Sequence, residues 1–180
     1  MSGVSKTPLY AMVAYVRGPV ATFVEDLRAE LHPEQAHLAA HITVLPPREL
    51  KAPEDVAIRE LKERAGRFLA FEVEFGETEA FVPTTPTVFI RIAKSAHRFR
   101  DMHEAFDAGA CRYDEQWPYM PHLTIVKLPT FEQIVPAAQM ARERWASFPG
   151  ARTAPVKELT FVREGEGGLW IDLATISLIE

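Results

Sequence analysis

The sequence predicts an α+β fold built from a duplicated unit, and three observations support this prediction. Short β-branched or alternating segments typical of strands are interleaved with segments of helical spacing. The order of these segments repeats once, and each series contains a proline-terminated strand that carries a His-x-Thr motif. No low-complexity linker separates the two series. We therefore expect a single domain over residues 1–180, made of two pseudo-symmetric lobes.

The first series fills the N-terminal half of the chain. Pro19 follows a strand-breaking Arg-Gly pair and suits the first turn of a helix, where its missing N–H would have no partner. The strand with the first motif is expected to end at Pro46-Pro47, because proline removes a ladder donor. The expected elements are strands over 9–16, 41–45 and 71–75, and helices over 19–31 and 53–68.

The second series repeats this order. Ser95 and Thr130 are helix start signals and Gly109 is a stop signal, while Pro136 is expected to break or kink the last helix. The expected elements are strands over 87–93, 121–128, 156–163 and 169–178, and helices over 95–108 and 130–148.

The two His-x-Thr motifs are His41 with Thr43 and His122 with Thr124. Residues i and i+2 of a strand point to the same face, roughly 6.5 Å apart, so each motif presents an imidazole and a hydroxyl together. A pseudo-two-fold axis between the units would bring two imidazoles and two hydroxyls to one groove. We expect the imidazoles to lie on the order of 5–8 Å apart.

These four side chains suit phosphodiester chemistry. One neutral imidazole can remove a proton from water or a sugar hydroxyl, while the other, protonated, donates a proton to the departing oxygen. The threonine hydroxyls can hydrogen-bond the non-bridging phosphoryl oxygens, and the scheme requires no metal and no cofactor. The alternative is that the histidines are ordinary sheet residues and that threonine is present for its strand propensity. Two motifs in equivalent slots of a repeated pattern favour the chemical interpretation.

The segments His41–Val44 (HITV) and His122–Ile125 (HLTI) resemble the paired H-x-T/S-x motifs of the 2H phosphoesterases. This family includes the 2′-5′ RNA ligase-like proteins and the 2′,3′-cyclic nucleotide phosphodiesterases. The resemblance implies a bilobal fold with two antiparallel sheets around a central groove and helices on the outer faces. It also implies metal-independent hydrolysis of RNA-type phosphodiesters, with the two histidines as catalytic residues and the two threonines as phosphate ligands. The family acts on several substrates, so the natural one stays open.

Arg91 and Tyr119 are further candidate substrate-binding residues. Arg91 interrupts an apolar strand, so it either binds phosphate in the groove or pairs with a carboxylate on the outer face. Trp117 and Tyr119 precede the second motif and either stack on a base or pack beside the neighbouring prolines.

Other polar residues near the motifs are expected to lie outside the groove. Lys127 lies five positions after the histidine of the second motif and should face away from it while the strand stays regular. Arg48 follows the predicted end of the first motif strand and is expected to be solvated in an exposed loop. His97 and His103 lie on a charged helix and are expected at the surface.

A metal site is the alternative use of the first motif. His32, His37 and His41 are close in sequence, but their spacing crosses a helix end, a loop and a strand, and no carboxylate or cysteine pattern completes a ligand set. We therefore expect no bound metal. No glycine-rich phosphate loop or dinucleotide fingerprint is present in the sequence.

The composition limits the binding partners and the cellular compartment that we expect for the protein. The net charge of −5 argues against tracking an extended duplex, although a local basic pocket for a small nucleotide or an RNA end remains compatible with it. No window approaches the roughly 18 apolar residues of a membrane span. Cys111 is the only cysteine, which excludes an internal disulfide and fits a reducing cytoplasm. We expect a cytoplasmic monomer that does not bind membranes.

The sequence leaves two functions of different classes open. The first is a phosphodiesterase, a hydrolase that acts on 2′,3′-cyclic phosphates or 2′-5′ linkages. The second is a nucleotide or RNA-end binding module with the same groove and no turnover. Two intact His-x-Thr pairs favour the enzyme, because binding alone does not need two acid/base groups.

Overall fold

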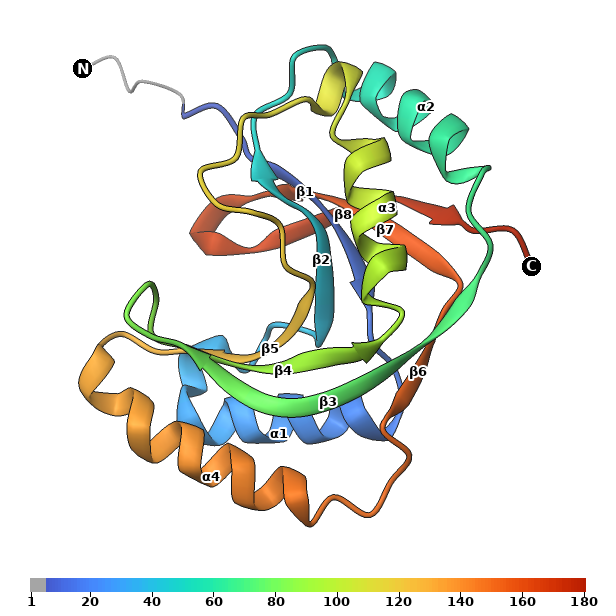
Figure 1. Cartoon of the computed structure of the whole chain (residues 1–180). Helices are drawn as coiled ribbons and strands as arrows, with labels where there is room; N and C mark the ends of the chain where they lie inside the picture. Colours follow the sequence, from blue (N-terminus) through green and yellow to red (C-terminus); the bar gives the residue numbers. More distant parts are fainter. Residues whose placement is uncertain (1–5) are drawn as a thin grey trace, which may run out of the picture.

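The computed structural model describes residues 6–180. Strands and helices alternate along the chain much as the sequence predicts (Figure 1). In chain order they are β1 (Tyr10–Tyr15), α1 (Pro19–Leu31), β2 (His41–Arg48), α2 (Glu54–Ala65), β3 (Phe71–Phe81), β4 (Thr87–Lys94), α3 (Ala96–Phe106), β5 (His122–Lys127), α4 (Ile134–Ala146), β6 (Thr153–Val156), β7 (Glu158–Glu164) and β8 (Trp170–Ser177).

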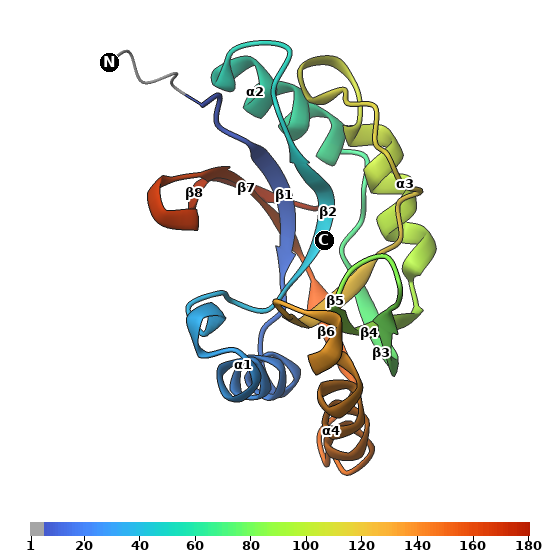
Figure 2. The ribbon, with the colours of Figure 1, turned by 90° about the vertical axis from the view of Figure 1, so that its left-hand side faces the viewer.

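The strands form one eight-stranded antiparallel sheet in the order β6-β3-β4-β5-β2-β1-β7-β8. Its two halves meet between β5 and β2, where Ile42 opposite Leu123 is the single paired position. The sheet bends sharply at this junction (Figure 2). The predicted α+β class is therefore confirmed, whereas the two expected sheets are two halves of one bent sheet.

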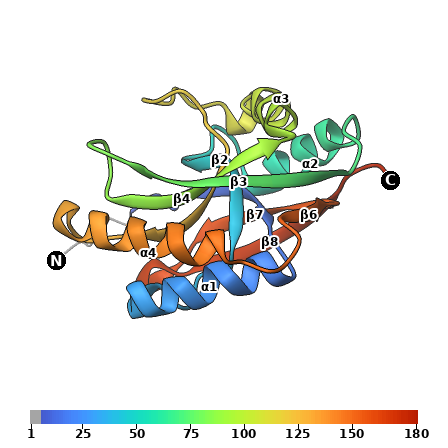
Figure 3. The ribbon, with the colours of Figure 1, turned by 60° about the horizontal axis from the view of Figure 1, so that its bottom comes forward.

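The helices lie on the outer side of the bent sheet. α1 and α4 run side by side beneath the half that contains β3, β4 and β5, and α2 and α3 cover the other half (Figures 1 and 3). α1 packs against β5 and α3 packs against β2, so each of these helices contacts the motif strand of the other series. No helix within residues 6–180 combines the length and the apolar character needed to cross a membrane.

The helix predictions are accurate where capping and burial agree. α1 begins at Pro19 as expected and buries Val20, Val24 and Leu27, which lie on one face at helical spacing. α4 begins at Ile134, after a 3₁₀ turn over Phe131–Gln133, and not at the predicted Thr130. Pro136 does not break it, because the first turn of a helix has no intrahelical use for the missing N–H.

The prediction that β2 ends at Pro46-Pro47 is wrong, because the strand continues to Arg48. The register between β1 and β2 shifts at this point, and the pairing with β5 has already ended at Ile42. The two prolines therefore lie where few ladder donors are required, which is where proline is tolerated in a sheet. β3 is also longer than expected, and the short strand β6 precedes β7 as a separate element.

Candidate active site

The two His-x-Thr motifs lie side by side at the junction of the two half-sheets. With Ile42 opposite Leu123, the antiparallel register puts His41 across from Thr124 and Thr43 across from His122. Ile42 and Leu123 are fully buried on one face, and the motif side chains lie on the other. The histidines occupy diagonal positions, for which side chains are roughly 7–8 Å apart. This general spacing lies within the range expected for two imidazoles that flank one phosphate, and the separation of the two rings stays a prediction.

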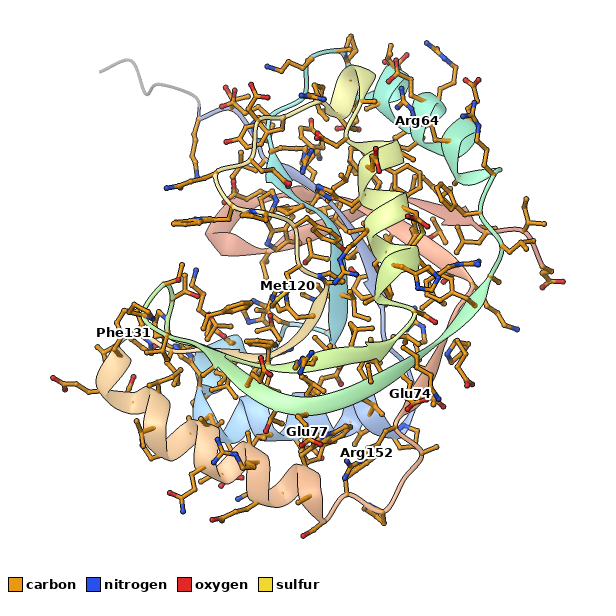
Figure 4. The ribbon with its side chains drawn as sticks, viewed as in Figure 1. Arg64, Glu74, Glu77, Met120, Phe131 and Arg152 are labelled. Carbon is orange, nitrogen blue, oxygen red and sulfur yellow. The ribbon has the colours of Figure 1, made fainter. Side chains whose placement is uncertain are left out.

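Both imidazoles are held in the same way. Nδ1 of His41 donates to the carbonyl oxygen of Ala39 at 2.8 Å, and Nδ1 of His122 donates to that of Met120 at 2.8 Å. Met120 lies where the chain enters β5 beside β2 (Figure 4). Because a carbonyl oxygen only accepts, each Nδ1 carries the hydrogen and each Nε2 is left to accept or donate a proton.

Burial is the largest influence on the charge of both imidazoles. It lowers the pKa of His41 and that of His122 below the ordinary value of 6.5, because desolvation disfavours the charged ring. The positive charges of Arg28 and of a protonated His122 lower the pKa of His41 further. Neutral imidazole is therefore favoured at both positions.

Aromatic rings surround the two histidines. Phe81 and Phe89 are stacked on each other and meet the ring of His122 at centroid distances of 5.0 and 5.2 Å. Tyr15 lies opposite His41 in the β1–β2 register, with centroids 6.5 Å apart. The sequence alone does not identify these three residues, because only the strand pairing shows that they share the face of the histidines.

Arg28 of α1 is a second kind of site residue that the sequence did not reveal. Its buried guanidinium donates to the carbonyl oxygens of Thr124 at 2.8 Å and Ile125 at 2.7 Å, and also to that of Leu38. These bonds connect α1 to β5 and to the loop before β2. Arg28 thereby supports the backbone of the second motif from behind.

His103 and Tyr119 support the first motif in an equivalent way. The Tyr119 hydroxyl donates to the carbonyl oxygen of Thr43 at 2.8 Å, and Nδ1 of His103 donates to that of Val44 at 2.8 Å. The two rings are stacked with centroids 4.0 Å apart, and Nε2 of His103 lies 2.9 Å from a carboxylate oxygen of Glu115. The expectation that His103 is a surface residue is wrong, because this stack and the contacts with Val44 and Glu115 hold it between α3 and β2.

Arg48 corrects a further expectation. It is 1% exposed and forms ion pairs with Asp107 at 2.8 Å and Glu115 at 2.7 Å, and it donates to the carbonyl oxygen of Cys111. The predicted solvated loop does not exist, because β2 continues to this residue. Arg48 instead connects β2 to the long segment between α3 and β5.

Two cavities flank the histidines and share Thr43 in their walls. The cavity on the His41 side has a volume of about 680 Å³, and the cavity on the His122 side about 630 Å³. We call them the His41 cavity and the His122 cavity. The walls of the His41 cavity include Tyr15, Arg28, His37, Thr124, Lys127, Trp170 and Asp172. The walls of the His122 cavity include Pro46, Phe81, Tyr113, Glu115, Trp117, Tyr119 and Met120.

Lys127 lines the His41 cavity although strand parity predicts that it faces away. Val126 pairs with Val88 and Thr124 pairs with Phe89, so Ile125 is an extra residue on β5. Such a bulge shifts the alternation of side chains by one position. The prediction required a regular strand, and the strand is not regular here.

Comparison with known proteins places this fold and these motifs in a family. Residues 16–168 match the 2′-5′ RNA ligase superfamily. The chain belongs to this superfamily. The resemblance to the 2H phosphoesterases, which rested on the two His-x-Thr motifs, is confirmed. No curated protein sequence matches the chain at a significant level.

Solved structures of similar fold include proteins from E. coli, Thermus thermophilus and Kluyveromyces marxianus. Apo LigT from E. coli is 14% identical with a TM-score of 0.63, and 97% of this chain aligns with 100% of LigT. TT0787 of Thermus thermophilus is 18% identical with a TM-score of 0.62, and 94% of this chain aligns with 97% of TT0787. Usb1 from Kluyveromyces marxianus, solved with uridine monophosphate, is 9% identical with a TM-score of 0.54, and 97% of this chain aligns with 100% of Usb1. LigT has also been solved with phosphate and with 3′-AMP.

Within this superfamily fold, the two additional candidate residues have different surroundings. Tyr119 lines the His122 cavity, and its hydroxyl donates a hydrogen bond to the carbonyl oxygen of Thr43. Arg91 lies directly across from His122 in the register, is exposed, and has a guanidinium nitrogen 3.4 Å from a carboxylate oxygen of Glu79. It does not line either cavity. A substrate contact by Arg91 stays a prediction.

The part of the chain that the structure describes contains no cluster of potential metal ligands around His41. Within residues 6–180, no three or more histidine, cysteine, aspartate or glutamate side chains are arranged to hold a metal ion. His32 and His37 therefore do not complete a ligand set with His41.

Proposed function

We propose that the protein is a phosphodiesterase that acts on RNA-type phosphodiesters, either 2′,3′-cyclic phosphates or 2′-5′ linkages, without a metal. The observation that supports it most strongly is the pair of imidazoles on diagonal positions of two adjoining strands, each fixed at Nδ1 by a carbonyl oxygen. This arrangement leaves two Nε2 atoms beside two threonine hydroxyls. Membership of the 2′-5′ RNA ligase superfamily supports the same class of chemistry.

The different surroundings of the two histidines suggest their roles. Burial lowers the pKa of both histidines, and at His41 the positive charge of Arg28 further disfavours a proton. We therefore assign the single proton of the pair to His122. His41 would then be the general base and His122 the general acid.

The reaction follows from these roles. Nε2 of His41 takes the proton of the attacking oxygen, which belongs to water or to a ribose hydroxyl, as that oxygen bonds to phosphorus. Nε2 of His122 gives its proton to the leaving oxygen as its bond to phosphorus breaks. The hydroxyls of Thr43 and Thr124 donate to the non-bridging oxygens and hold the phosphoryl group between the rings.

Ligands in the solved relatives fit a substrate of this kind. LigT binds phosphate and 3′-AMP, and Usb1 binds uridine monophosphate. We infer that this chain also takes a small nucleotide or an RNA end, with one phosphoryl group between His41 and His122.

The test is an assay of the purified protein with 2′,3′-cyclic AMP and with 2′-5′-linked diadenosine monophosphate, each with and without EDTA. We expect turnover of at least one substrate, unchanged by EDTA. His41→Ala and His122→Ala should each lower kcat by about 10²–10⁴-fold, because each removes a proton-transfer group. His97→Ala is the matched control, since His97 is an exposed histidine of α3 outside both cavities.

Two results would contradict the proposal. Tight binding of both compounds with no turnover would indicate a nucleotide-binding module. Complete inhibition by EDTA that a single divalent ion reverses would indicate a metal-activated nucleophile.

A further inference from the structure

The groove has a direction that the four motif residues alone do not reveal. Its two cavities have different walls: the His41 cavity is lined from β1, β2, β5 and β8, and the His122 cavity from β2, the β3–β4 connection and the segment that leads into β5. Lys127 lies in the wall of the first cavity and Trp117 in the wall of the second. A phosphodiester between the histidines would therefore have protein surface on both sides of it.

The pseudo-two-fold relation makes the two ends directly comparable. Lys127 lies five residues after His122, and Pro46 lies five residues after His41. A register shift precedes each of them, and Lys127 lines the His41 cavity whereas Pro46 lines the His122 cavity. The same strand position thus carries a cation at one end and an uncharged ring at the other.

The His41 cavity is electropositive. No carboxylate within residues 6–180 forms an ion pair with Lys127, and the guanidinium of Arg28 forms part of the same wall. Burial is the main cause of the lowered pKa of His41, and the positive charge of Arg28 lowers it further. Asp172 is the one carboxylate in this wall, and it accepts a hydrogen bond from Tyr15 at 2.6 Å. An anion beside Lys127 would therefore meet an unpaired ammonium group.

The His122 cavity is aromatic and offers no free cation. Its one charged side chain besides His122 is Glu115, whose two carboxylate oxygens are occupied by Arg48 and His103. Trp117 is 63% exposed and Met120 is 40% exposed, which is unusual for side chains of this size. Flat aromatic surface of this kind is what a nucleobase stacks on.

We propose that the groove binds a nucleotide on each side of the central phosphoryl group, with a second phosphate against Lys127 and an uncharged base against Trp117. This inference rests on the proposed function and narrows its substrate class. The preferred substrate is an RNA-type dinucleotide or chain end that carries an additional phosphate on the Lys127 side. A mononucleoside 2′,3′-cyclic phosphate would fill one side only.

Lys127 can reach such a phosphate. It lies two ladder positions beyond Thr124, or about 7 Å along the strand, because Ile125 is the bulged residue. Its flexible four-carbon stem allows the ammonium group to extend back along the groove. The separation suits a phosphate one nucleotide away from the central one.

The first experiment measures binding of adenosine 3′,5′-bisphosphate, 3′-AMP and 5′-AMP by calorimetry. The bisphosphate tests either orientation, because either phosphate can lie between the histidines while the other reaches Lys127. We expect it to bind about fivefold more tightly than the better monophosphate, the gain of an exposed charge pair. Lys127→Gln and 0.5 M salt should each abolish this advantage. Lys157→Gln, an exposed lysine outside both cavities, should retain it.

The second experiment measures binding of the dinucleotide d(ApA), which lacks the 2′-hydroxyl. Trp117→Ala should weaken d(ApA) by about tenfold, because one base loses its stacking surface. The same variant should bind adenosine 3′,5′-bisphosphate as the unmodified protein does. Trp117 and Lys127 are both exposed, so neither change should affect folding.

Two outcomes would overturn the inference. Equal affinity for the bisphosphate and the better monophosphate would rule out the second phosphate site. Tighter binding of the bisphosphate that persists in Lys127→Gln would rule it out as well. Unchanged d(ApA) affinity in Trp117→Ala would remove the base site. Neither measurement depends on turnover. A protein that binds as expected but hydrolyses nothing would therefore contradict the proposed function and leave this inference standing.

Discussion

At the scale of single residues, the strongest effect is the burial of two imidazoles beside each other. Desolvation lowers the pKa of both, and at His41 the charges of Arg28 and His122 lower it further. A base must be neutral and is active above its pKa, whereas an acid must be protonated and is active below its own. The charge of Arg28 thus gives two chemically identical side chains different surroundings, which is the basis of the roles proposed for them.

This difference predicts the pH dependence of turnover. Since both pKa values lie below 6.5 in the free protein, the profile of kcat/KM should be bell-shaped with its maximum on the acid side of pH 6.5. The profile of kcat should lie at higher pH, because the bound phosphate anion favours the protonated rings. The two limbs of each profile reflect the coupled pair of histidines and not either histidine alone. Initial rates between pH 4.5 and 9 at constant ionic strength would measure both profiles. A maximum of kcat/KM above pH 6.5 would contradict the assigned environment.

At the scale of elements, the segment between α3 and β5 depends on a few polar contacts. It contains only a short 3₁₀ turn, yet it carries Trp117 and Tyr119 into the His122 cavity. Arg48 holds it from β2 through Asp107 and Glu115, and Glu115 also bonds His103. The wall of the cavity therefore depends on one buried arginine.

Arg48→Met should destabilise the protein strongly. It keeps much of the side-chain volume but leaves two partly buried carboxylates without their partner, which costs about 3–5 kcal/mol in comparable sites. Arg112→Met is the matched control, because Arg112 is exposed and its ion pair with Asp114 is 3.6 Å long. That change should cost about 1 kcal/mol or less. Urea unfolding of the two variants gives both values. Equal losses would mean that Arg48 does not hold the segment.

The elements also show which parts of the site the sequence could predict. Strand parity placed the motif histidines and threonines on one face, and α1 followed from its proline start and apolar spacing. Lys127 and Arg48 were misplaced for a shared reason, since each follows a local irregularity in a motif strand. A bulge or a strand that passes through two prolines is decided by the neighbouring strands, and one sequence does not reveal them.

At the scale of the whole molecule, helices and strands of each series pack against or pair with those of the other series. α1 packs on β5 and α3 packs on β2, while β3 pairs with β4 and β7 pairs with β1 across the series boundary. Each motif strand is thus covered by a helix of the other series. We therefore infer that residues 6–180 unfold as one cooperative unit, and the single domain stays a prediction.

Two natural probes in opposite halves of the sheet can test this cooperativity. Trp145 of α4 is buried and donates to the carbonyl oxygen of Gly76 in β3. Cys111, the only cysteine, is buried near α2, and burial raises the pKa of its thiol to about 11, so it is protected while that half stays folded. The variant with Trp117→Phe and Trp170→Phe leaves Trp145 as the only fluorescent indole.

In this variant, urea titrations of Trp145 fluorescence and of Cys111 labelling by a thiol reagent should give coincident midpoints, because loss of either half exposes the motif strand of the other. Reagent pulses must be short compared with refolding, so that labelling reports the population already open. Early exposure of Cys111 with unchanged Trp145 fluorescence would show that the α2 and α3 half opens alone. The groove would then have one stable wall and one mobile wall, and the helices that pack on the motif strands would not couple the two halves.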